Sequence, residues 1–119
     1  ELAFTDARFL GIDAPVRLSG NVENTPGCYL VGPNGGLELD HGVLRAARHV
    51  HMNSKEAEYY GVHAGDRMRL VVDSDQGGSL EGLICRISDK EKLEVHIDTD
   101  EGNALNLVQA RKVYIERCS

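Results

Sequence analysis

Short apolar runs separated by turn-forming residues are the feature that most limits how this chain can fold. The runs at 67–72, 80–87 and 93–98 largely alternate apolar and polar residues, as expected of strands in a sheet with one buried face. A spacing of about 8–12 residues between strands favours small β-barrels over an open parallel sheet. We therefore expect a mainly β protein of one or more small β-barrel domains, with short strands capped by short helices.

Two stretches carry the start and stop signals of short helices. A helix is predicted over 5–10, with Thr5 as its N-cap and a glycine after it. A second is predicted between Asn53 and Gly61, where Glu56 stands at the spacing of a capping box. The segments around them resemble each other, because each helix is followed by a strand that ends in Arg-Leu. This repeat predicts two related units.

The remaining predictions concern strands and turns. A hairpin is predicted over 28–39, and a single strand over 42–51. Residues 98–103 are predicted to form an acidic loop, and 113–115 a last strand.

Three histidines stand in predicted strands where their side chains can converge. His49 and His51 are two residues apart, so both point to the same face, with their bases about 6.5–7 Å apart. The same alternation places Glu94, His96 and Asp98 on one face of a later strand. Imidazole and carboxylate groups bind zinc, with Zn–N bonds of about 2.0–2.1 Å. The pattern indicates a metal site, and solvated polar side chains on a strand are the alternative.

Charge and hydropathy argue against several classes of protein. The formal net charge is −6 at pH 7, and the chain has no basic patch and no Trp for binding phosphate backbones or stacking bases. It contains no apolar run of about 18 residues that would predict a membrane span, and no recognisable signal peptide. We therefore expect no nucleic-acid or membrane partner and a cytoplasmic location.

The cysteines Cys28, Cys85 and Cys118 are odd in number and lack Cys-x-x-Cys spacing. This favours a reducing compartment and argues against a disulfide framework or a thiolate zinc site. The alternation of the strand places Cys85 on the same face as Leu83 and Ile87, which predicts a buried structural thiol rather than a nucleophile.

Several motifs in combination resemble one known family. They are the segments at 11–20, 32–33, 48–52 and 96–104, of which Arg-His-Val-His-Met and the later His-Ile-Asp-Thr-Asp-Glu are the most specific. In these the chain is similar to the phosphate propanoyltransferases, the PduL-type phosphotransacylases of bacterial microcompartments. The resemblance extends from residue 1 to about 104 and corresponds to the C-terminal half of the family.

The resemblance implies a fold and a reaction. The family has two β-barrel domains capped by short helices, with two zinc ions between them, and it converts acyl-CoA (propanoyl or acetyl) and phosphate into acyl phosphate and CoA. Residues 1–46 would be the second part of one barrel, whose upstream part is missing, and residues 47–119 most of a second. The lumen of a microcompartment and propanediol degradation are the implied setting.

The resemblance also assigns metal ligands by position. His49 and His51 match ligands of one zinc ion, and Glu1 falls where the family has the acidic ligand of that ion. His96 matches a ligand of the second ion. The three histidines would thus be both metal-binding and catalytic.

Two residues are assigned to substrates. Asn103 falls at a position that contacts CoA, although on sequence alone a turn is the better explanation. Arg48 would neutralise phosphate or the phosphates of CoA, and a surface arginine on a strand is the alternative.

The chain departs from the family in its first half. Family members carry an earlier His-x-His that supplies two further ligands of the second zinc ion, and this chain has none; His41 and His63 are single and expected to face solvent. The missing half would come from another chain, or the piece would be an incomplete, inactive enzyme. A homo-oligomer is compatible with either arrangement.

Two other functions fit the same residues. A cupin-like oxygenase or isomerase also uses His-x-His with a distant Glu and His, and iron rather than zinc would distinguish it. The chain could instead be a non-catalytic module that kept the fold of an enzyme.

Overall fold

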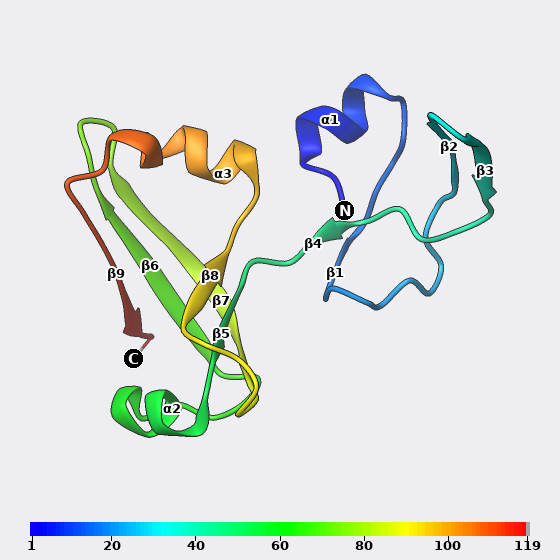
Figure 1. The fold of residues 1–119 in the computed structure, drawn as a ribbon. Helices are drawn as coiled ribbons and strands as arrows, with labels where there is room; N and C mark the ends of the chain where they lie inside the picture. The colour runs from blue at the N-terminus through cyan, green and yellow to red at the C-terminus, as the bar shows by residue number, and fades with distance from the viewer. Residues whose placement is uncertain (119) are drawn as a thin grey trace. The chain divides into compact units, whose positions relative to one another are not determined.

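A computed structural model gives the fold of the protein and describes residues 1–118. The chain forms two compact units, Glu1–Ala47 and a larger unit that begins at Arg48. Each unit contains more strands than helices (Figure 1), so the prediction of a mainly β protein with short helices is confirmed. Within the described residues, no helix has the length and apolar character needed to cross a membrane.

The first unit contains one helix and two small sheets. Its elements are α1 (Phe4–Phe9), β1 (Val16–Arg17), β2 (Cys28–Gly32), β3 (Gly35–Leu39) and β4 (Arg45–Ala46). β1 and β4 pair in parallel, while β2 and β3 form the antiparallel hairpin that the sequence predicts. A buried cluster of Ala7, Ala14 and Val43 forms its core.

The second unit is built on a five-stranded sheet with the strand order β8-β5-β7-β6-β9. Its elements are β5 (His49–Met52), α2 (Ser54–Tyr60), β6 (Arg67–Asp73), β7 (Gly78–Ile87), β8 (Glu94–His96), α3 (Thr99–Ala104), the 3₁₀ helix η1 (Leu107–Gln109) and β9 (Lys112–Arg117). β5 pairs in parallel with β7 and antiparallel with β8. The sheet therefore has β8 at one edge and β9 at the other.

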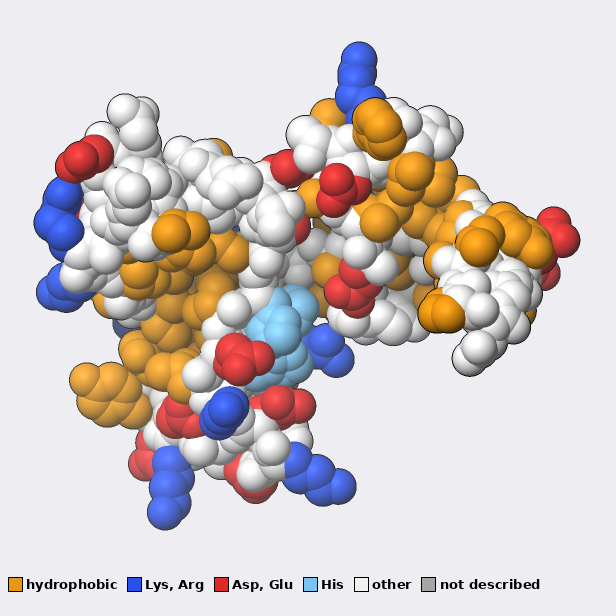
Figure 2. Space-filling model, turned by 45° about the horizontal axis from the view of Figure 1, so that its top comes forward, with side chains coloured by type: hydrophobic (Ala, Val, Ile, Leu, Met, Phe, Trp, Pro, Cys, Tyr) orange, Lys and Arg blue, Asp and Glu red, His pale blue; other side chains and the backbone are white. Residues whose placement is uncertain are grey.

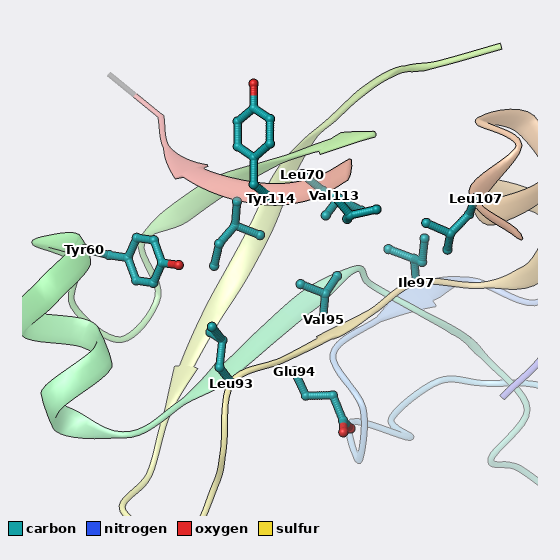
Figure 3. Close-up of a pocket in the computed structure, with 10 residues that line it drawn as sticks. Tyr60, Leu70, Leu93, Glu94, Val95, Ile97, Leu107, Val113 and Tyr114 are labelled. Carbon is teal, nitrogen blue, oxygen red and sulfur yellow. The ribbon is translucent and has the colours of Figure 1, made fainter. Parts of the chain in front are cut away.

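This sheet curls around an apolar hollow. A cavity of about 320 Å³ is lined from both edges of the sheet, by Val95 of β8 and Val113 of β9 among others (Figure 3). Because opposite edges line one cavity, the sheet is a half-barrel rather than a flat layer. The carboxylate of Glu94 points away from the hollow, whereas Val95 points into it (Figure 3). Apolar and polar side chains of β8 thus separate by face, as alternation requires.

The core of the second unit is formed by nine buried side chains that pack together: Val50, Met52, Ala57, Val62, Met68, Leu70, Val72, Leu83 and Cys85. Cys85 is 1% exposed, so its predicted burial is confirmed. Burial in apolar surroundings raises the pKa of its thiol to about 11. The thiol is therefore protonated at neutral pH, as expected of a structural side chain.

Helix α2 begins and ends as predicted. The side chain of Asn53 accepts a hydrogen bond from the Glu56 backbone, and the Glu56 side chain accepts one from the Asn53 backbone. Gly61 ends the helix with φ of +68°, in the left-handed region that glycine enters at little cost. The capping-box prediction is confirmed.

Three local predictions were wrong. Helix α1 begins at Phe4 after Ala3, which makes no side-chain cap, so Thr5 is not its N-cap. The strand predicted over 42–51 is two strands, because β4 pairs with β1 while β5 joins the larger sheet. The acidic loop predicted over 98–103 is largely α3, which a second capping box stabilises at its start.

Candidate metal centre

Strand pairing places the three predicted histidines side by side. β5 and β8 are antiparallel neighbours in a register that sets His49 opposite His96. Directly opposite residues in such a pair have their Cβ atoms about 4.5–5.5 Å apart. His51 follows His49 on the same face of β5, so the three side chains share one surface of the sheet.

The rings form one compact group. The ring centroid of His49 lies 4.7 Å from that of His96 and 4.9 Å from that of His51. The ring centroids of His51 and His96 are 4.8 Å apart. One nitrogen from each ring lies within 4.8 Å of the others. Histidine side chains gather in one patch at the surface of the molecule, with acidic side chains beside them (Figure 2). The predicted convergence of the histidines on one face is confirmed.

Burial of the histidine side chains favours the neutral form that metal binding requires. His49 is only 4% exposed. Burial lowers the pKa of His51, and the neighbouring His49 and His96 lower it further, whereas Glu91 opposes the shift. The lowered pKa of His51 favours its neutral form, and neutral imidazole is the form that binds a metal ion.

Two carboxylates lie close to nitrogen atoms of the rings. A carboxylate oxygen of Glu94 lies 2.8 Å from Nε2 of His96, and an oxygen of Glu91 lies 3.8 Å from Nδ1 of His51. A carboxylate that accepts from one ring nitrogen fixes the tautomer and directs the other nitrogen toward a metal. Glu94 is placed for this role, whereas Glu91 at 3.8 Å is beyond hydrogen-bond distance and acts on His51 through its charge. Nothing in the spacing of Glu91 indicated this contact.

The donor set fits a divalent metal ion. Three imidazole nitrogens around one tetrahedral ion, each about 2.1 Å away, would be about 3.4 Å apart. The nitrogens of His49, His51 and His96 lie within 4.8 Å of one another, which is near this spacing. Three protein ligands leave the fourth position of such an ion open, which is typical of catalytic sites.

Arg48 is held within the protein next to this group. Its Nε donates to a carboxylate oxygen of Glu101 at 2.6 Å, and its Nη1 donates to the backbone oxygen of Glu81 at 2.8 Å. The sequence indicates the first contact only indirectly: Asp98 and Glu101 have the spacing of a capping box, so Glu101 lies at the start of a helix. The role of Arg48 as a substrate ligand stays a prediction.

The other predicted residues lie outside β5 and β8. Glu1 belongs to the first unit, where its carboxylate accepts a hydrogen bond from the Ser19 hydroxyl. Asn103 is exposed in α3 rather than in a turn. Their assignments to zinc and to CoA stay predictions. The side chains of His41 and His63 are exposed, as predicted.

Comparison with known proteins identifies the family. A family model described as phosphate propanoyltransferase matches residues 1–108. The chain belongs to this family. The resemblance that its motifs indicate is thereby confirmed.

Individual phosphate propanoyltransferases agree with this. The chain is 55% identical to that of Planctopirus limnophila over 114 residues, which cover 95% of this chain and 47% of the relative. It is 45% identical to that of Thermotoga maritima, with 97% and 55% covered, and 46% identical to that of Salmonella typhimurium, with 87% and 50% covered. The chain thus spans about half the length of the curated relatives it matches.

Proposed function

We propose that this chain carries the metal centre of a zinc-dependent phosphate acyltransferase. The reaction is acyl-CoA, with a propanoyl or acetyl group, plus phosphate to give acyl phosphate plus CoA. Membership of the phosphate propanoyltransferase family supports the reaction class. The single observation that supports the site is the grouping of His49, His51 and His96 within reach of one metal ion.

The proposed reaction needs no protein nucleophile. A phosphate oxygen attacks the acyl carbon, the new C–O bond forms, the C–S bond breaks, and CoA leaves as a thiolate. A zinc ion bound by the histidines would act as Lewis acid and template for these charged groups. His49, His51 and His96 would hold that ion, while Glu94 orients the ring of His96.

The finer assignments complete the proposal. In this chain the three histidines would hold one ion. In a complete enzyme with two zinc ions, Glu1 would take the place of His96 beside His49 and His51, and His96 would bind the second ion. Asn103 would contact CoA. The remaining ligands would come from the other half that the longer relatives carry, in this protein or in another chain, and a bacterial microcompartment would be the location.

The test measures metal content and turnover together. The chain is purified with added zinc and metal per chain is measured, and CoA release from propanoyl-CoA and phosphate is followed with a thiol reagent. The second assay uses this chain with the complementary half of the Planctopirus limnophila relative. We expect His49→Ala to lose metal and most turnover, because two ligands hold an ion far more weakly than three.

The matched control is His63→Ala, which removes an exposed histidine of the same unit and should change neither quantity. Unchanged zinc content and rate in His49→Ala would refute the proposed centre. Iron in place of zinc would favour an oxygenase, and bound zinc without turnover in either assay would favour a non-catalytic module.

A further inference from the structure

His96 is the least secured member of the histidine group. It ends β8, a strand of three residues at the edge of the sheet, whose one neighbour in the strand order is β5. Its side chain is 45% exposed, whereas His49 is buried. Short edge strands open more readily than central ones, so strand pairing alone holds this ring weakly.

One carboxylate joins the segments on either side of the histidine pair. Oε1 of Glu101 accepts from the backbone nitrogen of Asp98 at 3.0 Å, and Oε2 accepts from Nε of Arg48 at 2.6 Å. Asp98 comes two residues after His96, and Arg48 directly precedes His49. Glu101 therefore ties the chain just beyond one ring to the chain just before the other.

Arg48 is itself fixed to the middle of the sheet. Its Nη1 donates to the backbone oxygen of Glu81 in β7, and its own backbone oxygen accepts from the backbone nitrogen of Ile84 at 3.2 Å. The side chains of Arg48 and Glu101 are 34% and 17% exposed. An ion pair that is partly withdrawn from water and hydrogen-bonded on both partners is stronger than an exposed surface pair.

We propose that Arg48 and Glu101 are a positioning pair that holds His96 against His49 and so assembles the metal site. The pair fixes the start of α3, and with it the end of β8, to the strand that carries the other two histidines. This differs from a substrate role for Arg48. If Arg48 bound phosphate, removing the charge of Glu101 would release the arginine for its ligand and leave metal affinity unchanged.

The test uses substitutions that spare the capping box. Arg48→Gln breaks the pair but leaves the bonds between Asp98 and Glu101 in place, and Glu101→Gln keeps a side-chain oxygen for that cap. The double variant completes a cycle. Arg111 forms an exposed arginine–carboxylate pair with Asp75 and a second with Asp73 in the same unit. Arg111→Gln breaks both pairs and Asp75→Asn breaks one, and these two variants serve as controls.

The first readout needs no metal. Nuclear Overhauser contacts between the ring protons of His49 and His96 are measured in the 119-residue chain, where the ring centroids are 4.7 Å apart. We expect these contacts to weaken in Arg48→Gln and Glu101→Gln and to persist in both controls. Contacts of wild-type strength in the two variants would overturn the proposal.

The second readout is Co²⁺ affinity and the visible spectrum of the Co²⁺ site, and it rests on the proposed function. Losing an outer partner of a metal ligand costs about 10–100-fold in affinity, so we expect a dissociation constant about tenfold higher in each single variant. The double variant should be no weaker than the weaker single one, because both remove the same link. Wild-type affinity in both single variants would overturn the inference.

The two readouts separate two kinds of failure. If the wild-type chain binds no Co²⁺, the proposed function fails, while the ring contacts still decide whether the pair positions His96. If Arg48→Gln does not fold, Arg48→Lys replaces it, since lysine keeps the charge but cannot reach Glu101 and the Glu81 backbone with a planar fork. An intermediate loss of ring contact is then expected, and no loss would contradict the proposal.

Discussion

The two units of this chain differ in how much they bury. Among the described residues, the first unit has two-stranded sheets and a buried cluster of Ala7, Ala14 and Val43. The second has a five-stranded sheet and a buried cluster of nine side chains. Both contain a short helix followed by a strand, so the same local pattern occurs with two very different cores.

The difference shows where a precise site can form. In the first unit the hairpin residues Tyr29, Val31 and Leu37 are exposed, and an isolated two-stranded hairpin is marginally stable in water. In the second, β5 is a central strand flanked on both sides, and it carries two of the three histidines. Metal ligands need fixed geometry, which a well-packed sheet supplies better than a small hairpin.

Amide hydrogen exchange offers the strongest way to break this comparison. Amides paired between β6 and β7 lie over the larger core and should open only with most of the unit, whereas those of β2 and β3 should open locally. We expect exchange on the order of 100-fold faster in the hairpin, measured by NMR at neutral pH. Equal protection in both sheets would mean that the first unit is as stable as the second.

A matched pair of core substitutions sharpens the comparison. Val72→Ala in the second unit removes two methyl groups from the nine-residue cluster, and Val43→Ala removes the same groups from the smaller cluster. We expect the free energy of unfolding to fall by about 2 kcal/mol in Val72→Ala and by about 1 kcal/mol in Val43→Ala. The larger cluster is expected to close the space left by the lost methyl groups less completely. Urea unfolding measures both, and a larger loss for Val43→Ala would contradict the ranking.

The thiol of Cys85 gives a further effect, which is the smallest at neutral pH because it is absent there. Burial raises the pKa of Cys85 from 9.0 to about 11, so between these values the folded protein keeps a proton that the unfolded chain has lost. Stability contributed by this thiol should therefore fall as the pH rises through that window. We expect Cys85→Ala to flatten the fall in unfolding free energy, followed by urea titration at several pH values.

Cys28→Ala is the control for that experiment, since Cys28 lies in the hairpin of the first unit and is partly exposed. It should leave the pH dependence unchanged. An identical slope in Cys85→Ala and the wild type would show that the buried thiol does not titrate in this way.

Several features followed from short-range patterns. The hairpin at 28–39 was predictable because turn residues separate two runs that alternate, and α2 because Asn53, Glu56 and Gly61 each have a defined role at a helix end. The placement of His49 and His51 on one face followed from the two-residue period of a strand.

Other features were not readable from local sequence. Helix α3 is too short and polar to show a helical period, so its acidic residues suggested a loop although Asp98 and Glu101 have capping-box spacing. The strand predicted over 42–51 breaks because its two parts find partners in different sheets. Such partners lie tens of residues away, and no local propensity encodes them.

By itself, the sequence determined which face of each strand carries its histidines, where α2 begins and ends, and that the chain is mainly β. These depend on backbone periodicity and on hydrogen bonds between near neighbours. Only the tertiary structure decided that His96 lies opposite His49 and that Arg48 reaches Glu101. Both depend on strand register and on contacts between segments far apart in the sequence, and long-range packing selects these.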